Sequence, residues 1–204
     1  MRHRGGVSEH LEAVVLAGGA ASRMGGADKP GLTIAGRTLL EHVVAAVRDH
    51  APHAHVTVVG PRRRRPRAHY VREDPPGGGP VPALRTGLAR VRAPWFVLLA
   101  ADLPYLRAHH LVALEAAVGN DGSRQASGAV SVDTSGRPQW LTGLWHTVTV
   151  RAALAEYSGR SLHKLLRPLD PVHVALGTGS GNFDVDTPED LDRARAALED
   201  PTGG

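Results

Sequence analysis

The sequence contains no cysteine and few aromatic residues. The absence of cysteine excludes disulfide bonds, thiolate metal sites and cysteine nucleophiles. Aromatic residues make up 4% of the chain, so the core must be built mainly from Val, Leu and Ala. No apolar run approaches the roughly 20 residues that span a bilayer, and the first ten residues lack the apolar stretch of a signal peptide. We therefore expect a soluble cytoplasmic protein.

The charge of the chain is only slightly positive, with 24 basic and 20 acidic residues. Much of the excess lies in one run, Arg62 to Arg65 with Arg67. Uniform basicity would indicate a nucleic-acid binder, whereas a single local cluster favours a solvated loop. Two other interpretations of the run stay open. It draws in an anionic substrate, or it binds nucleic acid, which predicts DNA binding that weakens steeply with salt.

Segments with the patterns of strands and helices alternate along the chain. Apolar runs predict strands at residues 13–17, 55–59, 68–71, 95–100, 128–132, 140–145 and 172–176. Helical spacing of apolar residues predicts helices at residues 38–50, 83–91, 111–118, 148–157, 161–166 and 188–198. This alternation predicts a largely parallel α/β sheet with helices on both faces. We expect one domain at residues 11–199, between loose tails at 1–10 and 200–204.

Local patterns add detail to this outline. The run at 95–100 is continuously apolar, which is typical of a strand buried on both faces. Residues 74–80 read Asp-Pro-Pro-Gly-Gly-Gly-Pro and predict a loop. Thr187 and Asp190 have the spacing of a capping box at the start of the last helix. The 12 histidines show no metal-ligand spacing, and His109 and His110 are expected on a helix surface.

The most informative segment is residues 16–29, which read Leu-Ala-Gly-Gly-Ala-Ala-Ser-Arg-Met-Gly-Gly-Ala-Asp-Lys. It follows an apolar strand, and its glycines let backbone N–H groups approach oxygen atoms closely. Arg23 and Lys29 add positive charge. The segment has neither the Gly-Lys-Ser/Thr of a Walker A motif nor the Gly-x-Gly-x-x-Gly fingerprint. The pattern predicts a polyphosphate site, with a plain tight turn as the alternative.

Two further segments follow predicted strands and carry carboxylates. Asp102 comes two residues after the strand at 95–100, and Asp184-Val185-Asp186 precedes the last helix. Ligands of open α/β sheets bind beyond the carboxyl ends of the strands, so these segments should meet the glycine loop there. Cations would then bind phosphate, and carboxylates would bind a divalent metal such as Mg²⁺. Asp102 is also typical of a turn, and Asp186 of a helix start, so these interpretations stay open.

The motif Leu-Ala-Gly-Gly-x-x-x-Arg-Met-Gly-x-x-Asp-Lys resembles the signature loop of sugar-nucleotide-type nucleotidyltransferases. It resembles more closely that of the molybdenum cofactor guanylyltransferases, the MobA-like proteins. The similarity continues, in the family's order, through residues 36–40, 73–74, 79–80, 101–104 and 184–190. It implies a Rossmann-like three-layer α/β/α nucleotidyltransferase fold, mostly parallel, with an antiparallel strand in the C-terminal half.

The resemblance also implies an activity. In this family the phosphate of molybdopterin cofactor attacks the α-phosphorus of GTP, and pyrophosphate leaves. The residues that the resemblance implies for nucleotide binding are Leu16, Ala17, Gly18, Gly19, Lys29, Asp74 and Asp102. Those implied for catalysis are Arg23, Lys29 and Asp102, and those for Mg²⁺ are Asp102 and Asp186. GTP and molybdopterin cofactor are the expected substrates of a monomer that binds neither nucleic acid nor membrane and meets transient partners during cofactor delivery.

Three departures from the family pattern concern the choice of base. Asp184 and Asp186 stand where guanylyltransferases often have Asn, and Gly60 stands where an Asn contacts the base. Residues 79–83 read Gly-Pro-Val-Pro-Ala instead of Gly-Pro-Leu-Ala-Gly. CTP in place of GTP, or a sugar phosphate in place of the pterin, therefore stays an alternative. A nucleotide-binding regulatory protein without turnover is an alternative of another class.

Two segments remain ambiguous on the acceptor side. Residues 137–140, Arg-Pro-Gln-Trp, fall where the family places its acceptor loop, but they also fit a turn into an edge strand. Residues 160–162, Arg-Ser-Leu, fit either a pterin contact or an ordinary helix start.

Overall fold

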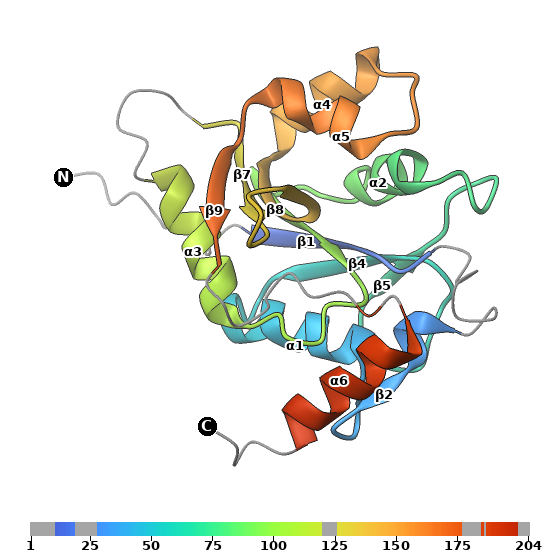
Figure 1. Cartoon of the computed structure of the whole chain (residues 1–204). Coiled ribbons are helices and arrows are strands. Elements are labelled where there is room, and N and C mark those ends of the chain that lie inside the picture. The colour runs from blue at the N-terminus through green and yellow to red at the C-terminus, as the bar shows by residue number, and fades with distance from the viewer. Residues whose placement is uncertain (1–10, 19–27, 120–125, 177–184, 186, 200–204) are drawn as a thin grey trace.

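The computed structural model describes residues 11–18, 28–119, 126–176, 185 and 187–199. Within these residues, seven strands form one sheet in the order β5-β4-β1-β6-β8-β7-β9 (Figure 1). Their bounds are β1 Leu11–Leu16, β4 His55–Val59, β5 His69–Val71, β6 Trp95–Ala100, β7 Gly128–Val132, β8 Pro138–His146 and β9 Val172–Ala175. Of the seven, β8 alone is antiparallel, to β6 and to β7. The predicted fold class is confirmed.

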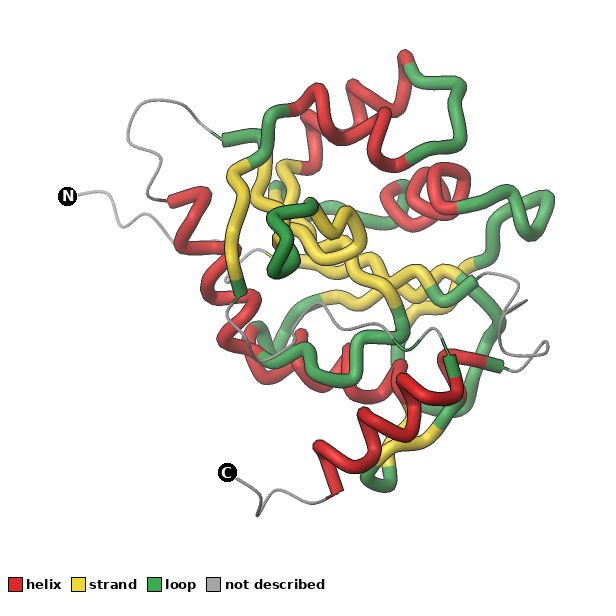
Figure 2. The backbone as a smooth tube through the Cα atoms, viewed as in Figure 1, coloured by secondary structure: helices red, strands yellow, loops and turns green. Residues whose placement is uncertain are grey.

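Helices cover both faces of this sheet, as Figure 2 shows. The bounds are α1 Leu39–His50, α2 Pro80–Leu88, α3 Ala108–Gly119, α4 Thr147–Glu156, α5 Leu162–Leu166 and α6 Pro188–Glu199. Alternate residues of β1 point to opposite faces. Ala13 and Val15 pack in the core layer with α1 and α3, and Val14 and Leu16 pack in the layer with α2, α4 and α5. The sheet is thus the middle of three layers.

A third, small apolar cluster lies where α6 meets a hairpin that the sequence did not predict. The hairpin pairs β2, Thr33–Ile34, with β3, Arg37–Thr38. Ile34 and Leu39 pack there with Val185 and Leu191. Two 3₁₀ turns, Lys29–Gly31 before the hairpin and Arg167–Leu169 after α5, complete the described elements. Strands of two residues carry no readable apolar alternation, which explains the omission.

Strand β6 lies between β1 and β8, and its four middle residues are buried. The prediction of a strand buried on both faces is confirmed. The predicted start of α2 at residue 83 is wrong, because the helix begins at Pro80. Proline fits the first helical position, where no backbone N–H is needed. The predicted exposure of His110 is also wrong, because its side chain is buried near the start of α3.

No helix among the described residues is long and apolar enough to cross a membrane.

Gly87 sets how closely α2 packs on the sheet. A Cβ at this position would lie 2.5 Å from Val14 Cγ1 and 2.9 Å from Val59 Cγ2. We expect Gly87→Ala to lower the free energy of unfolding, measured by urea denaturation, by about 1–3 kcal/mol. The reason is that the cost of overpacking the contact with the sheet exceeds the roughly 1 kcal/mol by which alanine is favoured over glycine in a helix. Gly119→Ala is the control, since a Cβ there meets nothing within 4 Å. Equal stability of the two variants would contradict the packing argument.

We expect His110 to make the free energy of unfolding depend on pH. Its Nδ1 accepts a hydrogen bond from the Arg107 N–H at 3.1 Å, and burial, helped by His109 and Arg107, lowers its pKa to about 4. The unfolded state therefore binds more protons between about pH 4 and 6.5, and stability rises with pH across that window. His110→Asn keeps an acceptor without titrating. In urea denaturation, the change in the free energy of unfolding across this pH window should be smaller in His110→Asn than in the parent protein, by on the order of 1–2 kcal/mol. The same pH dependence in both proteins would contradict the assignment.

Candidate active site

Two of the residues predicted for the site are in direct contact. Lys29 opens the 3₁₀ turn Lys29–Gly31, and Asp102 follows β6 by two residues. The Lys29 Nζ lies 2.6 Å from the Asp102 Oδ2, and the two side chains are 15% and 19% exposed. A cation from the segment after β1 and an anion from the segment after β6 thus meet at the carboxyl edge of the sheet.

Backbone hydrogen bonds bring the third predicted segment to the same place. The Ala101 N–H donates to the Leu16 carbonyl at 3.1 Å, which continues the ladder between β6 and β1. The Val185 N–H donates to the Asp102 carbonyl at 3.2 Å. Val185 is fully buried. The segment before α6 therefore lies against the residue that carries the carboxylate.

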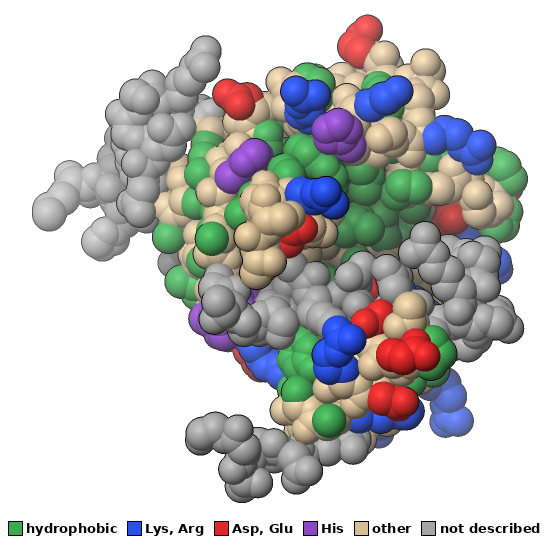
Figure 3. Space-filling model, viewed as in Figure 1, with side chains coloured by type: hydrophobic (Ala, Val, Ile, Leu, Met, Phe, Trp, Pro, Cys, Tyr) green, Lys and Arg blue, Asp and Glu red, His purple; other side chains and the backbone are tan. Residues whose placement is uncertain are grey.

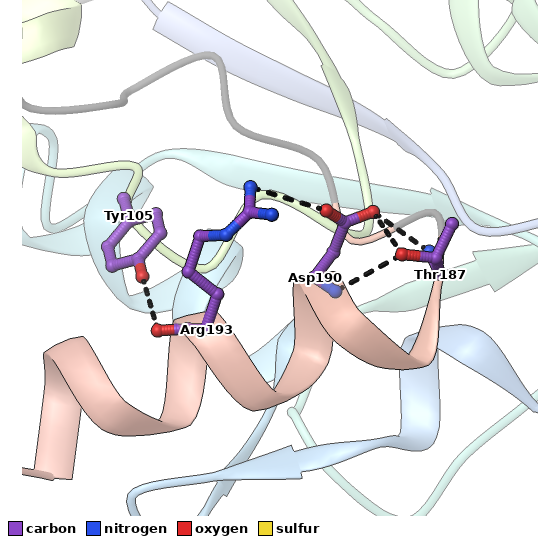
Figure 4. A network of polar contacts seen from close by, with 4 residues as sticks. All are labelled: Tyr105, Thr187, Asp190 and Arg193. Carbon is purple, nitrogen blue, oxygen red and sulfur yellow. Dashed lines mark hydrogen bonds and ion pairs between the residues drawn. The ribbon is translucent and has the colours of Figure 1, made fainter.

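The start of α6 is fixed by the capping box that the sequence predicts (Figure 4). The Thr187 N–H and hydroxyl donate to Asp190 Oδ2 at 2.9 and 2.8 Å, and the Asp190 N–H donates to Thr187 Oγ1 at 3.1 Å. Arg193 Nη1 lies 3.6 Å from the other carboxylate oxygen of Asp190. The Tyr105 hydroxyl, from the segment after β6, donates to the Arg193 carbonyl at 3.4 Å. These contacts fix the position of Thr187 at the start of α6, two residues after the buried Val185.

The end of β1 offers backbone rather than side chains. Leu16 and Ala17 are buried, and the Ala17 N–H donates to the Val59 carbonyl at 2.8 Å. Gly18 is exposed. Gly60 lies close behind, because a Cβ there would be 2.8 Å from the Ala17 carbonyl oxygen. Neither glycine adds a side chain to this edge, so a ligand can approach the main chain.

Glu73 lies beside the candidate site, although the sequence points to it only as part of a motif. Its side chain is buried, and its Oε1 accepts a hydrogen bond from the Gly77 N–H at 3.2 Å. A Cβ on Gly18 would lie 3.5 Å from the same oxygen. The neighbouring Asp74, which the sequence analysis selected, is exposed. The signal that could have found Glu73 is the proline- and glycine-rich turn after it, which needs an acceptor for its N–H groups.

Four residues singled out from the sequence, Gly19, Arg23, Asp184 and Asp186, lie outside the described residues. Within the described ranges, no group of three or more His, Asp and Glu side chains is arranged to hold a metal. Mg²⁺ is usually held by one or two carboxylates together with substrate phosphates. Asp102, at the edge of the sheet, fits such a donor set without further protein ligands.

The arginine run is not simply a solvated loop, since one member has a specific partner. Both terminal nitrogens of Arg63 hydrogen-bond the two carboxylate oxygens of Asp28, directly before Lys29. The Arg63 side chain is 17% exposed. Its hydrogen bonds lower the pKa of the Asp28 carboxyl, and the carboxylate raises the pKa of Arg63. The other arginines of the run, Arg62, Arg64, Arg65 and Arg67, are exposed.

The two segments that the sequence leaves ambiguous, residues 137–140 and 160–162, also have definite positions. Trp140 lies within β8, which is flanked by β6 and β7, so the alternative of an edge strand is wrong. Its ring stands 6.4 Å from that of Trp145 and 5.6 Å from that of His163. Arg160 donates from Nε and Nη2 to the Gly78 carbonyl, at 3.3 and 3.2 Å. On the face of the molecule seen in Figure 3, hydrophobic side chains lie near the middle, with Lys, Arg and His side chains around them.

Comparison with known proteins identifies the family of the chain. Residues 13–173 match the family model described as the MobA-like NTP transferase domain. The chain belongs to this family. A probable molybdenum cofactor guanylyltransferase of Trichormus variabilis is 32% identical over 200 residues, which cover 94% of this chain and 93% of that protein. A molybdenum cofactor guanylyltransferase of a Bradyrhizobium species is 34% identical, covering 92% and 93%.

Solved structures show the same fold at lower identity. The molybdopterin-guanine dinucleotide biosynthesis protein A of Archaeoglobus fulgidus superposes with a TM-score of 0.71 at 19% identity, over 92% of this chain and 98% of that one. A 2-C-methyl-D-erythritol 4-phosphate cytidylyltransferase of Thermus thermophilus gives 0.67 at 20% identity, over 93% and 99%. With the family membership, the predicted class of enzyme, a nucleotidyltransferase, is confirmed for this MobA-like chain.

Proposed function

We propose that this MobA-like enzyme transfers GMP from GTP to molybdopterin cofactor, with Mg²⁺ bound and with release of pyrophosphate. The observation that carries the proposal is the contact between Lys29 and Asp102. It provides a cation for phosphate and a carboxylate for a divalent metal beside the exposed backbone at Gly18. The names of the relatives support GTP and the pterin as substrates.

The reaction places modest demands on these residues. A phosphate oxygen of the acceptor forms a bond to the α-phosphorus of GTP, and the bond to the bridging oxygen of the β-phosphate breaks. The attacking phosphate is already anionic, so no general base is required. Lys29 neutralises charge that develops on the leaving pyrophosphate, and Asp102 holds Mg²⁺. When bound, the metal supplies Lewis-acid stabilisation of the phosphoryl oxygens.

The remaining assignments follow from the family motif and form part of the proposal. The backbone at Leu16, Ala17 and Gly18, continued by Gly19, binds the nucleoside, with Asp74 at its edge. Arg23 assists Lys29 at the phosphates, and Asp186 is a second candidate for the metal. We further propose one nucleotidyltransferase unit at residues 11–199 that acts as a monomer in the cytoplasm.

The acceptor side is supported by the register of β8. Leu99 of β6 pairs with Thr142, the last pair between these two strands. Trp140 lies two residues beyond it, towards the edge where β6 delivers Asp102, because β8 runs antiparallel. Its ring is half-buried between Trp145 and His163. This aromatic surface suits a planar pterin better than a sugar phosphate.

The decisive experiment is turnover with purified protein, Mg²⁺ and molybdopterin cofactor, in parallel with GTP, CTP, UTP and ATP. GTP should yield pyrophosphate and a dinucleotide by mass spectrometry. Turnover with CTP alone would establish the alternative base, and nucleotide binding without pyrophosphate from any acceptor would establish a regulatory protein. Thermal shifts give an independent measure, since a ligand at 100 times its Kd adds about 2.7 kcal/mol of stability.

Lys29→Ala and Asp102→Ala should each lower kcat/KM with GTP at least about a hundredfold, a loss of roughly 2.7 kcal/mol in transition-state stabilisation. Each variant removes half of the contact that serves phosphate and metal. Asp192→Ala is the matched control, because this carboxylate is 75% exposed on α6. Steady-state pyrophosphate release measures all three. If the two site variants match the control, the assigned roles are wrong.

Trp140→Leu should raise KM for the pterin acceptor about tenfold while leaving KM for GTP within about twofold, because stacking on an aromatic side chain contributes about 1–3 kcal/mol per ring. Trp140→Phe should restore most of the loss. Trp95→Leu serves as the control, since Trp95 begins β6 at the opposite edge. Initial-rate kinetics with each substrate varied will decide. An equal rise in both KM values for Trp140→Leu would rule out an acceptor role.

A further inference from the structure

Two consecutive residues, Asp28 and Lys29, form ion pairs with different neighbours of β1. Asp28 pairs with Arg63, in the loop after β4, and Lys29 pairs with Asp102, after β6. The sheet order places β4 on one side of β1 and β6 on the other. The segment that carries the proposed phosphate-binding lysine is therefore tied to both flanking strands.

The Asp28–Arg63 pair has a geometry that specifies position. Its two parallel hydrogen bonds join the fork of the guanidinium to both carboxylate oxygens. Such bidentate pairs restrict orientation in a way that a lysine point charge does not. The pair also lies against the backbone of the following turn. A Cβ on Gly31 would be 2.3 Å from Asp28 Oδ2 and 3.0 Å from Arg63 Nη1.

Stability is a poor explanation for this pair. The Asp28 side chain is 62% exposed although that of Arg63 is only 17% exposed, and even a bidentate pair with one exposed partner is expected to contribute only about 1 kcal/mol. Position is the better explanation, because the turn after Asp28 is short and internally bonded. The Gly31 N–H donates to the Asp28 carbonyl at 2.9 Å, and the Leu32 N–H donates to the Lys29 carbonyl at 3.1 Å. Fixing Asp28 therefore fixes the backbone of Lys29.

We propose that Arg63 is a positioning residue for nucleotidyl transfer, acting through Asp28 to hold Lys29 where it meets the phosphates. This inference rests on the proposed function for its catalytic consequence. When Lys29 leaves Asp102 for a phosphate, the pair between Arg63 and Asp28 still holds the start of the turn. Misplacement of a catalytic group by about 1 Å can cost about a hundredfold in rate.

Kinetics of four variants distinguish positioning from general attraction of anions. Arg63→Ala should lower kcat about 10–100-fold and change KM for GTP less than about threefold, since the loss falls on the transition state. Arg63→Lys keeps the charge but loses the fork, so its kcat should stay low. Arg64→Ala removes the same charge from an exposed position in the same loop and should stay within about twofold of the parent. Asp28→Ala should match Arg63→Ala.

Two further tests sharpen the kinetic result. The double variant Asp28→Ala/Arg63→Ala should be no slower than either single variant, because both remove one interaction. Millimolar guanidinium chloride should restore part of the activity of Arg63→Ala and none to Arg64→Ala. Equal losses for Arg63→Ala and Arg64→Ala, erased alike by salt, would overturn the proposal in favour of electrostatic steering.

A measurement without turnover separates this inference from the proposed function. The chain contains only two lysines, Lys29 and the exposed Lys164. In protein labelled with ¹³C-lysine, the Lys29 Hε/Cε NMR signal should shift towards that of Lys164 in Arg63→Ala and stay in place in Arg64→Ala. An unmoved Lys29 signal in Arg63→Ala overturns the positioning role whatever the enzyme does. A wild-type protein that releases no pyrophosphate overturns only the proposed function.

Discussion

The parallel pairing of β1 with both β4 and β6 is the constraint from which the site follows. Because all three strands run in one direction, the segments after them emerge at one edge of the sheet. The ladder continues one residue past β1 and β6, through the Ala17 and Ala101 N–H groups. Gly18, Gly60 and Asp102 stand one or two residues beyond the ends of their strands. The pairing of the strands thus brings the exposed backbone of Gly18, the position without a side chain at Gly60 and the Asp102 carboxylate to the same edge of the sheet.

The contact between Lys29 and Asp102 stabilises both charges while the proposed site holds no ligand. Two half-buried charges compensate each other's lost hydration while the site is free. In the proposed function, a ligand that carried only negative charge would engage Lys29 and draw it away from Asp102, whose carboxylate would then need another cation. A polyphosphate with its divalent cation satisfies both groups together. The pair thus supports the proposed binding of a nucleotide together with its cation, and in that proposal it is preorganised for charge that develops in transfer.

Much of the fold could be predicted because local signals agree with the tertiary structure. The strands at 55–59, 95–100 and 128–132 have the predicted bounds, since continuous or alternating apolar runs end at Gly, Pro or a turn. The start of α2 was missed because Pro80 and Pro82 resemble helix breakers, although proline is compatible with a first turn. His110 was misplaced because its residue type does not show which side of α3 faces the core; it is buried with Leu111 and Leu114, and its Nδ1 accepts a hydrogen bond from the Arg107 N–H.

Some residues of the candidate site could likewise be predicted from the sequence, and others could not. Lys29 and Asp102 could be found because each belongs to a motif with fixed spacing. Arg63 could not, because its partner is 35 positions away and nothing in a run of arginines distinguishes one member from the next. Glu73 was overlooked for a related reason. Its neighbour Asp74 has the residue type expected of a ligand, and only the fold shows which of the two side chains turns inward.

The antiparallel strand β8 gives the two halves of the sheet different roles at this edge. Parallel strands bring only their carboxyl ends there, so they contribute loops, with glycines and charges. An antiparallel strand brings its amino end. There β8 has passed its last pair with β6 at Thr142, and its pairing with β7 shifts register and leaves residues 140–142 without a partner in β7. Trp140 lies in this irregular stretch of β8, and its ring packs against the rings of Trp145 and His163. In the proposed reaction, a flat acceptor would therefore meet a surface held by ring packing, while the phosphates would meet segments that ion pairs hold in place.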